Sequence, residues 1–214
     1  MTICIPKRPT NYIPVHGTGS FRIGRNGDWW QAGSRFSERL RKENIILTRP
    51  EDVFFWSSAL DGVFGGEETW FAAAASLRYY LRDIPVHRRN IIAHSHGGQV
   101  VMLCAAGLCF PDGIIRPTHM SNVILVDTPL RGDMQMVYNQ GRHFINNLVY
   151  IGDGGRNWMK RWGRLFGGDW KVRMEMEQAH HNIVRKGIGH SKVFNDPAIL
   201  EFAIEEGWFE HLRK

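Results

Sequence analysis

The stretch "NIIAHSHGGQVV" at residues 90–101 contains an apolar run, a serine between two histidines, two glycines and a second apolar run. The first run predicts a buried strand and the second a helix, so Ser95 falls on the turn between them. Small residues, Ala93 and Gly97, stand two positions to either side of the serine. A sharp strand-to-helix turn presses those two positions against neighbouring backbone. The pattern predicts a nucleophile on a strained turn, or, more simply, a serine that caps the helix.

Apolar runs and helical patterns alternate along the rest of the chain. Strands are expected at 12–17, 45–56, 90–95, 122–129, 147–153 and 181–190, and helices at 28–44, 67–83, 98–109, 134–145 and 196–212. Near-continuous apolar strands separated by helices indicate a parallel sheet covered on both faces. The predicted fold class is α/β, a three-layer αβα sandwich with a mostly parallel central sheet. The length of 214 residues favours a single domain over 1–214.

In such a sheet, ligands bind beyond the carboxyl ends of the strands, so the residues after each strand are the candidates for chemistry. A serine nucleophile needs a base, and "GIGHS" places His190 at the carboxyl end of the last predicted strand. His180 and His181 precede that strand and therefore lie at the wrong edge. His190 is the predicted general base.

Two aspartates at strand ends could orient that base. Asp153 ends the strand before the His190 strand, and Asp127 ends the strand before that one. Both satisfy the chain order Ser, Asp, His. Asp153 is favoured, because Asp127 is followed by Thr128 and Pro129, a turn in which an aspartate can bond its own backbone. Asp127 stays as the alternative acid.

The developing oxyanion needs backbone N–H donors. The glycine-containing loop "VHGTG" after the first strand offers them at Gly17 and Thr18, and His96 follows the serine directly. These three residues are the predicted oxyanion hole.

A metal centre is a competing interpretation of the His94 and His96 pair. No aspartate and histidine follow at the close spacing that would complete such a site, and the three cysteines show no CxxC spacing. We therefore expect neither a metal nor an organic cofactor.

Aromatic residues around the motif indicate an apolar pocket for the substrate. The candidates for substrate binding are Phe54, Trp56, Phe64 and Trp158. Each of them could equally fill the core beside the sheet. Residues 156–176 combine tryptophans with arginines and lysines at helical spacing, which is typical of a lid, of a helix on an anionic surface, or of an ordinary packed surface helix. A lid or cap segment is accordingly placed at 154–180.

The charge and hydropathy of the chain limit its partners. The net charge is +6, but the basic residues are spread along the sequence, which disfavours nucleic acid and leaves weak association with anionic surfaces. No apolar run approaches the roughly 18 residues of a membrane span, and the start of the sequence lacks the pattern of a signal peptide. The expected location is the cytoplasm.

The ordered motifs "PVHGTG", "FFWSS", "IIAHSHGGQVV", "VILVDTPLRG", "YIGDGG" and "GIGHS" resemble the α/β-hydrolase fold family, particularly its lipase-like and esterase-like members. The resemblance implies a minimal α/β-hydrolase fold with Ser95 as nucleophile, His190 as base and Asp153 as acid. It also implies the oxyanion hole described above and hydrolysis of a small or lipid-like carboxylic ester through an acyl-enzyme. Ala93 departs from the usual glycine.

Two alternatives to an esterase stay open. A thioesterase, amidase or peptidase would use the same triad and differ only in its pocket. A binding protein that has lost activity could keep the same fold, because fold does not settle function.

Overall fold

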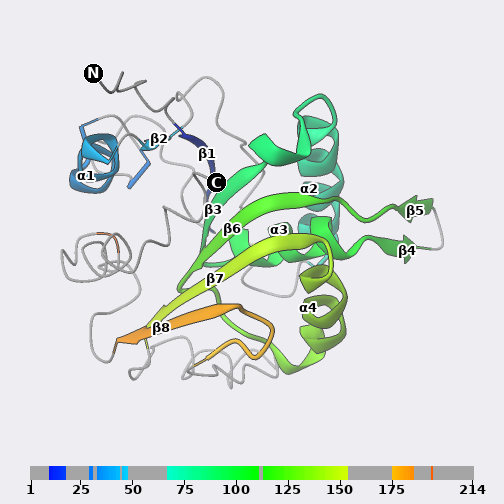
Figure 1. The fold of residues 1–214 in the computed structure, drawn as a ribbon. Helices are drawn as coiled ribbons and strands as arrows, with labels where there is room; N and C mark the ends of the chain where they lie inside the picture. The colour runs from blue at the N-terminus through cyan, green and yellow to red at the C-terminus, as the bar shows by residue number, and fades with distance from the viewer. Residues whose placement is uncertain are drawn as a thin grey trace, which may run out of the picture.

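The computed structural model describes residues 10–17, 29–30, 33–43, 45–47, 67–110, 113–153, 175–185 and 194. Figure 1 shows the arrangement of the elements. The strands are β1 (Thr10–Val15), β2 (Ile45–Leu47), β3 (Asn90–His94), β4 (Leu108–Phe110), β5 (Gly113–Ile115), β6 (Met120–Val126), β7 (Ile145–Asp153) and β8 (His181–Arg185). The α-helices are α1 (Arg35–Lys42), α2 (Glu67–Leu81), α3 (Gly97–Ala106) and α4 (Gln135–Arg142), and Val86–Arg88 and Gly132–Met134 form short 3-10 turns.

Six of these strands form a parallel sheet in the order β2-β1-β3-β6-β7-β8. The chain adds β2 on one side of β1 and all later strands of this sheet on the other, so the winding direction reverses between β1 and β3. In parallel sheets such a reversal opens a crevice at the carboxyl ends of the two strands. Val15 pairs with Ala93 and His94 with Val126, which aligns the carboxyl ends of β1, β3 and β6.

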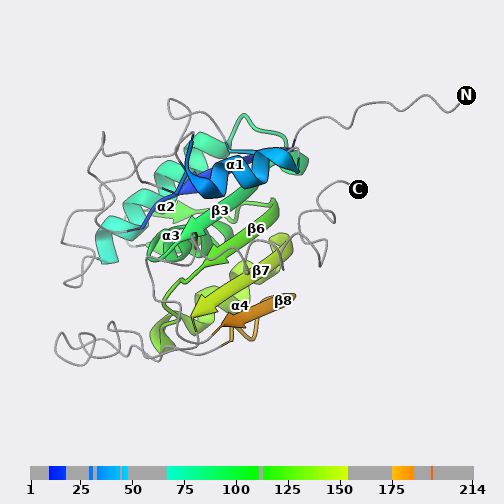
Figure 2. The ribbon, with the colours of Figure 1, turned by 90° about the vertical axis from the view of Figure 1, so that its left-hand side faces the viewer.

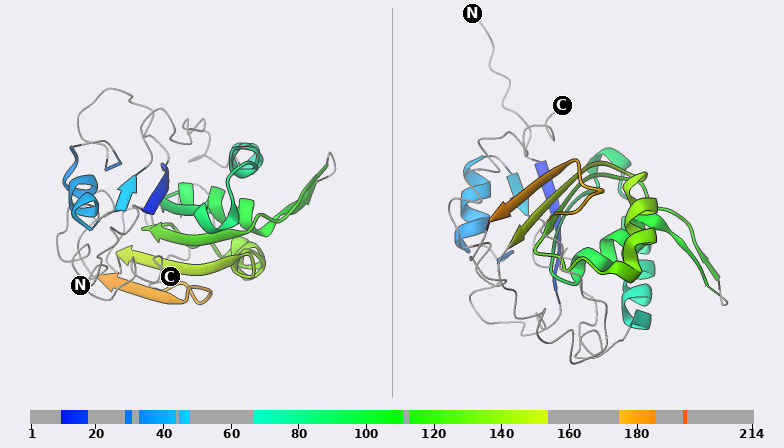
Figure 3. Two further views of the ribbon diagram at one scale, coloured as in Figure 1. Left: turned by 45° about the horizontal axis from the view of Figure 1, so that its top comes forward. Right: turned by 90° about the horizontal axis from the view of Figure 1, so that it is seen from below.

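Helices cover both faces of this sheet. Helix α1 lies on one face and α2, α3 and α4 lie on the other, as Figures 1 and 2 show from two directions and the right-hand view of Figure 3 shows from below. This is the predicted three-layer α/β architecture, and the six strands of the prediction are confirmed.

Strand alternation creates the two cores. Side chains such as Ile91 and Ala93 face one cluster, which includes Trp70 and Leu77 of α2 and most of α3. Ile92, between them, faces the other cluster, which contains Phe36 and Leu40 of α1. All ten residues of α3 are buried, because this helix is packed between the sheet, α2 and α4. The apolar sequence of α3 thus reflects its central position.

Helix α1 begins later than predicted. The pattern indicated a helix over 28–44, but the helix starts at Arg35, after Gly33 with a φ of 88° and the N-cap residue Ser34. The Ser34 hydroxyl accepts a hydrogen bond from the Ser37 N–H at 3.1 Å. Trp29 and Trp30 precede the helix, yet both are buried in the α1 core. The apolar spacing had located the core face correctly and the helix start wrongly.

Two other predicted helices end early. Helix α3 was expected to reach residue 109 but ends at Ala106, because Gly107 adopts a φ of 63°. The following residues form β4, which pairs with β5 as an antiparallel hairpin outside the main sheet. Helix α4 was expected to reach residue 145, but it ends at Arg142 and Ile145 opens β7.

Several predictions fall on residues that the structure does not describe. These are residues 48–56 of the second predicted strand, 186–190 of the last strand, the helix at 196–212 and most of the lid segment at 154–180. The end of that segment, residues 175–180, is described as a turn that leads into β8. Asn182 holds this turn through both backbone groups of Met176, whose side chain is buried. A single domain over 1–214 stays a prediction.

Within the described part of the chain, no helix has both the length and the apolar character that crossing a membrane requires.

Candidate active site

The carboxyl edge of the sheet brings several of the predicted site residues together. Gly17 follows β1, Ser95 follows β3 and Asp127 follows β6, while Asp153 is the last residue of β7. Because β1, β3, β6 and β7 are consecutive neighbours in the sheet, their ends form one continuous edge. The winding reversal lies between β1, which Gly17 follows, and β3, which Ser95 follows.

Ser95 stands on a sharp turn with an unusual backbone conformation. Its φ is 53°, a value in the left-handed region that non-glycine residues seldom adopt. Its N–H donates to the Val126 carbonyl at 3.0 Å, and its own carbonyl accepts from the Gly98 N–H at 3.0 Å. Strain of this kind costs about 1–3 kcal/mol and concentrates at functional sites.

The alternative of a simple helix cap fits this geometry poorly. The N-cap position of α3 is occupied by His96, one residue after the serine. A capping serine usually has an extended backbone at that position. The conformation of Ser95 is therefore that of a turn residue which precedes the cap.

The need for small residues around Ser95 has a direct structural reason. A Cβ atom on Gly97 would lie 2.5 Å from the His16 carbonyl oxygen and 2.6 Å from that of Val15. Both atoms belong to the backbone and cannot move easily aside. Ala93, on the other side of the serine, is fully buried in the sheet. A larger residue at either position would separate α3 or β3 from its neighbours.

Gly98 is a further constraint that the sequence pattern did not reveal. A Cβ atom there would lie 2.0 Å from Thr128 Oγ1 and 2.8 Å from Thr128 Cβ. Gly98 thus allows the first turn of α3 to pack directly against the loop that follows Asp127.

Gly17 is in direct contact with the serine. A Cβ atom on Gly17 would lie 2.7 Å from Ser95 Cβ, 3.0 Å from the His94 carbonyl oxygen and 3.3 Å from Ser95 Oγ. The loop after β1 therefore begins against the hydroxyl group of the serine. Thr18, the next residue of the predicted oxyanion hole, lies outside the described residues.

His16 supports this contact. Its ring Nδ1–H donates to the Gly17 carbonyl at 2.9 Å, and the ring lies 6.0 Å from that of Trp30. Burial lowers the pKa of His16, and the bond to Gly17 opposes that effect only in part. A neutral His16 fits the apolar surroundings on the α1 side of the sheet.

Asp127 shares the unusual backbone of Ser95. Its φ is 45°, its N–H donates to the Ile151 carbonyl at 2.6 Å, and its side chain is buried. The two residues that follow Asp127 each accept a side-chain hydrogen bond at the backbone carbonyl group. Tyr150 donates its hydroxyl to the Thr128 carbonyl at 3.1 Å, and the Gln99 side-chain amide donates to the Pro129 carbonyl. The loop after β6 is therefore fixed to both β7 and α3.

Gln99 is itself positioned by a second bond. The Tyr138 hydroxyl donates to Gln99 Oε1 at 2.8 Å and accepts from the Arg131 N–H at 3.2 Å. The bonds from Gln99 to Tyr138 and to Pro129 were not anticipated from the sequence, because they join residues 30 or more positions apart along the chain.

The remaining predicted site residues are only partly described. The backbone of Asp153 pairs with Arg185 at the end of β7, and nothing is described of its side chain. His190 and the four candidates for substrate binding, Phe54, Trp56, Phe64 and Trp158, lie outside the described residues. His180 and His181 do lie at the amino end of β8, as predicted, and the Leu148 N–H donates to His180 Nδ1 at 2.8 Å.

The two histidines beside Ser95 face different aromatic partners. The His94 ring lies 5.1 Å from Phe194, which stacks on Trp29 at 4.2 Å in the α1 core. The His96 ring lies 5.1 Å from Trp70 of α2. No three histidine, cysteine, aspartate or glutamate residues cluster as metal ligands within the described ranges. Phe194 carried no sequence signal that linked it to the site.

The sheet order, the two helical layers and the strained turn after the central strand define an α/β-hydrolase-like fold. The solved structures that resemble it include one described as a predicted CIB-like hydrolase from Thermoplasma acidophilum, with a TM-score of 0.51 and 16% identity over 98% of this chain and 88% of that one. A truncated carbohydrate esterase from gut microbiota aligns with a TM-score of 0.48 and 12% identity over 98% of this chain and 87% of that one. At these identities the likeness concerns the fold alone.

No protein-family model matches the chain, and no curated protein is significantly similar to it in sequence.

Proposed function

We propose that this protein is a serine hydrolase that cleaves carboxylic esters through an acyl-enzyme on Ser95. The observation that carries the proposal is the strained backbone of Ser95 directly against Gly17 at the winding reversal of the sheet. A serine that only filled space there would not need a left-handed φ, which carries a free-energy cost. The similarity in fold to a hydrolase supports the same reaction class.

In the proposed reaction, Ser95 Oγ attacks the ester carbonyl while His190 accepts the hydroxyl proton. The tetrahedral intermediate then expels the alcohol, which takes that proton from His190. Water, deprotonated by the same imidazole, attacks the acyl-enzyme carbonyl; the acyl–Oγ bond then breaks, the acid leaves, and Ser95 Oγ takes the proton back from His190. No cofactor enters this sequence of bond changes.

The oxyanion is assigned to backbone N–H groups of Gly17, Thr18 and His96. The contact between Gly17 and Ser95 supports this assignment, because donors must lie within about 3 Å of the oxygen that develops charge. His96 is the N-cap residue of α3, where the helix dipole also favours negative charge.

His190 is proposed as the base on two grounds. It follows the last strand of the sheet in the sequence, and it stands four positions before Phe194, whose ring packs against His94 beside the serine. The buried position of His16 in the α1 core, and the distant position of His180 at the amino end of β8, make those histidines poorer candidates.

Asp153 is proposed as the acid, with Asp127 as the alternative. Asp153 ends β7, which lies between β6 and β8 in the sheet. The fixed loop around Asp127 indicates a structural role for that residue, since its backbone positions the carbonyl groups bonded by Tyr150 and Gln99.

The substrate is proposed to be a small or lipid-like ester with an apolar acyl part. Its pocket would be formed by Phe54, Trp56, Phe64 and Trp158. The aromatic cluster of Trp29, Phe36 and Phe194 reaches His94 at the same edge and supports an apolar environment there.

The proposal is tested by hydrolysis of p-nitrophenyl esters with acyl chains from acetate to dodecanoate. Wild type should turn over at least one chain length, and Ser95→Ala and His190→Ala should each reduce kcat about a thousandfold or more. Asp153→Asn and Asp127→Asn form a matched pair that assigns the acid, because only the true acid should reduce kcat on that scale while the protein stays folded by circular dichroism. Turnover that survives Ser95→Ala would contradict the proposal, as would a folded wild type without activity on any ester.

The same enzyme preparations, given thioester and amide analogues of the preferred acyl chain, measure the bond preference. If kcat/KM is higher on the thioester or the amide than on the ester, that bond replaces the ester as the proposed substrate, and the proposed triad is unchanged.

A further inference from the structure

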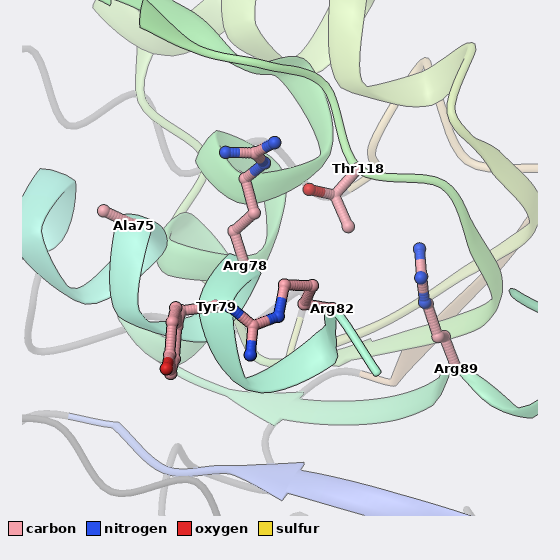
Figure 4. A pocket seen from close by; sticks show the side chains of 6 residues that line it. All are labelled: Ala75, Arg78, Tyr79, Arg82, Arg89 and Thr118. Carbon is pink, nitrogen blue, oxygen red and sulfur yellow. The ribbon is translucent and has the colours of Figure 1, made fainter. Parts of the chain in front are cut away.

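A basic hollow lies at the amino edge of the sheet, away from Ser95. Its volume is about 440 Å³, and it lies between the second half of α2 and the segments that lead into β3 and β6. Figure 4 shows the side chains that line it, which are Ala75, Arg78, Tyr79, Arg82, Arg89 and Thr118. Arg89 and Ser95 stand at opposite ends of β3, so the hollow is separated from the serine by about 20 Å of strand.

Three arginines line this hollow, and none of the described residues that line it is acidic. Arg82 is paired with Asp83 at 3.1 Å and lies 4.4 Å from the Tyr79 ring, so its charge is already compensated. Arg89 is held in place by two carbonyl groups, since it donates to Ile84 at 2.7 Å and to His119 at 3.0 Å. Carbonyl groups orient the Arg89 guanidinium without neutralising it.

Arg78 is the most available charge. It is half-buried, and within the described part of the chain no carboxylate lies within ion-pair distance of it. Two guanidinium groups without carboxylate partners on one hollow repel each other. An anion between them would remove that repulsion.

Thr118 adds a neutral donor to the same space. Its side chain is buried, and among the described residues its hydroxyl oxygen has no hydrogen-bond partner apart from a weak interaction with the Cys104 thiol. Figure 4 shows the Thr118 oxygen turned toward the side of the hollow where Arg78 lies. A buried hydroxyl without a good partner is costly, so a ligand that bonds it would gain affinity.

Cys104 of α3 is a buried thiol that interacts with Thr118 and with both arginine charges. Burial raises the pKa of the Cys104 thiol to about 12, while the Thr118 hydroxyl and the charges of Arg78 and Arg89 each act in the opposite direction. Both guanidinium charges therefore act on the same buried thiol.

We propose that this hollow is a binding site for a phosphate group. Arg78, Arg89 and Thr118 approach from three different segments, an arrangement that suits a tetrahedral oxyanion better than a planar carboxylate. Arginine forks form strong charge-assisted bonds to phosphate. Tyr79, which is 68% exposed, offers an aromatic surface beside the site for the group that carries the phosphate. The phosphate could belong to a soluble metabolite or to a lipid headgroup.

The test is calorimetric titration of the full chain with inorganic phosphate, with acetate as a second probe at equal ionic strength. Arg78→Gln is the test variant, because among the described residues Arg78 has no hydrogen bond or ion pair that the substitution would break. Arg35→Gln is the matched control, since Arg35 is an exposed arginine on α1 and the substitution removes the same charge.

We expect saturable binding of phosphate, weaker or absent binding of acetate, and a loss of about tenfold in phosphate affinity for Arg78→Gln with little change for Arg35→Gln. Absence of saturable phosphate binding would overturn the proposal. So would acetate binding as tight as phosphate binding, or equal losses in the two variants.

Vesicles identify the source of the phosphate. Phosphatidylcholine vesicles with and without phosphatidic acid, competed with inorganic phosphate, should bind the protein in a phosphate-sensitive manner if the ligand is a lipid headgroup. If the free phosphate binds and neither vesicle does, the ligand is a soluble phosphorylated compound. Vesicle binding that is insensitive to both phosphate and Arg78→Gln would assign membrane association to another surface and would contradict a lipid ligand here.

Discussion

Replacement of Gly17 by alanine is a sharp test of the contact between the β1 loop and Ser95. The added methyl group would lie 2.7 Å from Ser95 Cβ, which is 0.7 Å less than the 3.4 Å at which ordinary van der Waals contact begins. It would also lie 3.0 Å from the His94 carbonyl oxygen. Because the backbone of His94 is held in the central strand of the sheet, the displacement must fall on the β1 loop or on the serine.

Two magnitudes follow from that displacement. Overpacking of this size costs about 1–3 kcal/mol in the free energy of unfolding. A shift approaching 1 Å between a nucleophile and its oxyanion donors costs about a hundredfold in rate. We therefore expect Gly17→Ala to fold with reduced stability and to lose about a hundredfold in kcat/KM.

Gly33→Ala is the matched control. Gly33 has a φ of 88°, so alanine is strained there, but an added Cβ would meet no atom within 4 Å. The strain costs about 1–2 kcal/mol, similar to the cost at Gly17, without any contact with the site. Urea unfolding and p-nitrophenyl ester kinetics on both variants separate stability from activity. If Gly17→Ala keeps a kcat/KM within about threefold of Gly33→Ala, the proposed role of the β1 loop is wrong.

Three further predictions concern the surroundings of the site. Gly98→Ala should reduce the free energy of unfolding by about 1–3 kcal/mol, because the added methyl group would lie 2.0 Å from Thr128 Oγ1. In urea unfolding, Thr128→Gly in the same chain should restore part of that loss, and additive losses would contradict the contact. Because burial lowers the pKa of His16, the contribution of this residue to the free energy of unfolding should be fully present above the ordinary pKa of 6.5 and should fall as the pH decreases toward the lowered pKa. His16→Gln should lose this dependence in thermal unfolding between about pH 7 and 5. Parallel pH profiles of the wild type and the variant would refute the prediction. Leu77→Ala, at a fully buried position of α2, should cost about 2–5 kcal/mol in urea unfolding, and a cost below about 1 kcal/mol would show that the helix layer is packed differently.

Local sequence patterns were sufficient to predict the order of the elements. Ile91, Ile92 and Ala93 are buried on both faces of β3, and such continuous apolar runs are typical of the inner strands of a parallel sheet. The turn at Ser95 was predictable as well, because the requirement for small neighbours is local and Gly97 meets it against β1.

The boundaries of the elements and the contacts between distant residues were harder to predict from the sequence. The tryptophans at 29 and 30 lie in the core without belonging to a helix, so apolar spacing alone placed the start of α1 several residues too early. The bonds from Tyr138 to Gln99 and from Gln99 to Pro129 join residues that only the fold brings together. The basic hollow arises in the same way, since Arg78, Arg89 and Thr118 come from three segments with no shared motif.

Whether Ser95 is an activated nucleophile is tested by covalent labelling with a small fluorophosphonate, read by intact-mass and peptide mass spectrometry. Wild type, Ser95→Ala and His190→Ala are treated in parallel, and circular dichroism establishes that each is folded. We expect one adduct per chain, located on Ser95, absent in Ser95→Ala and formed far more slowly in His190→Ala. A folded wild-type protein that forms no adduct, or forms it on another residue, would contradict the assignment of Ser95 as an activated nucleophile.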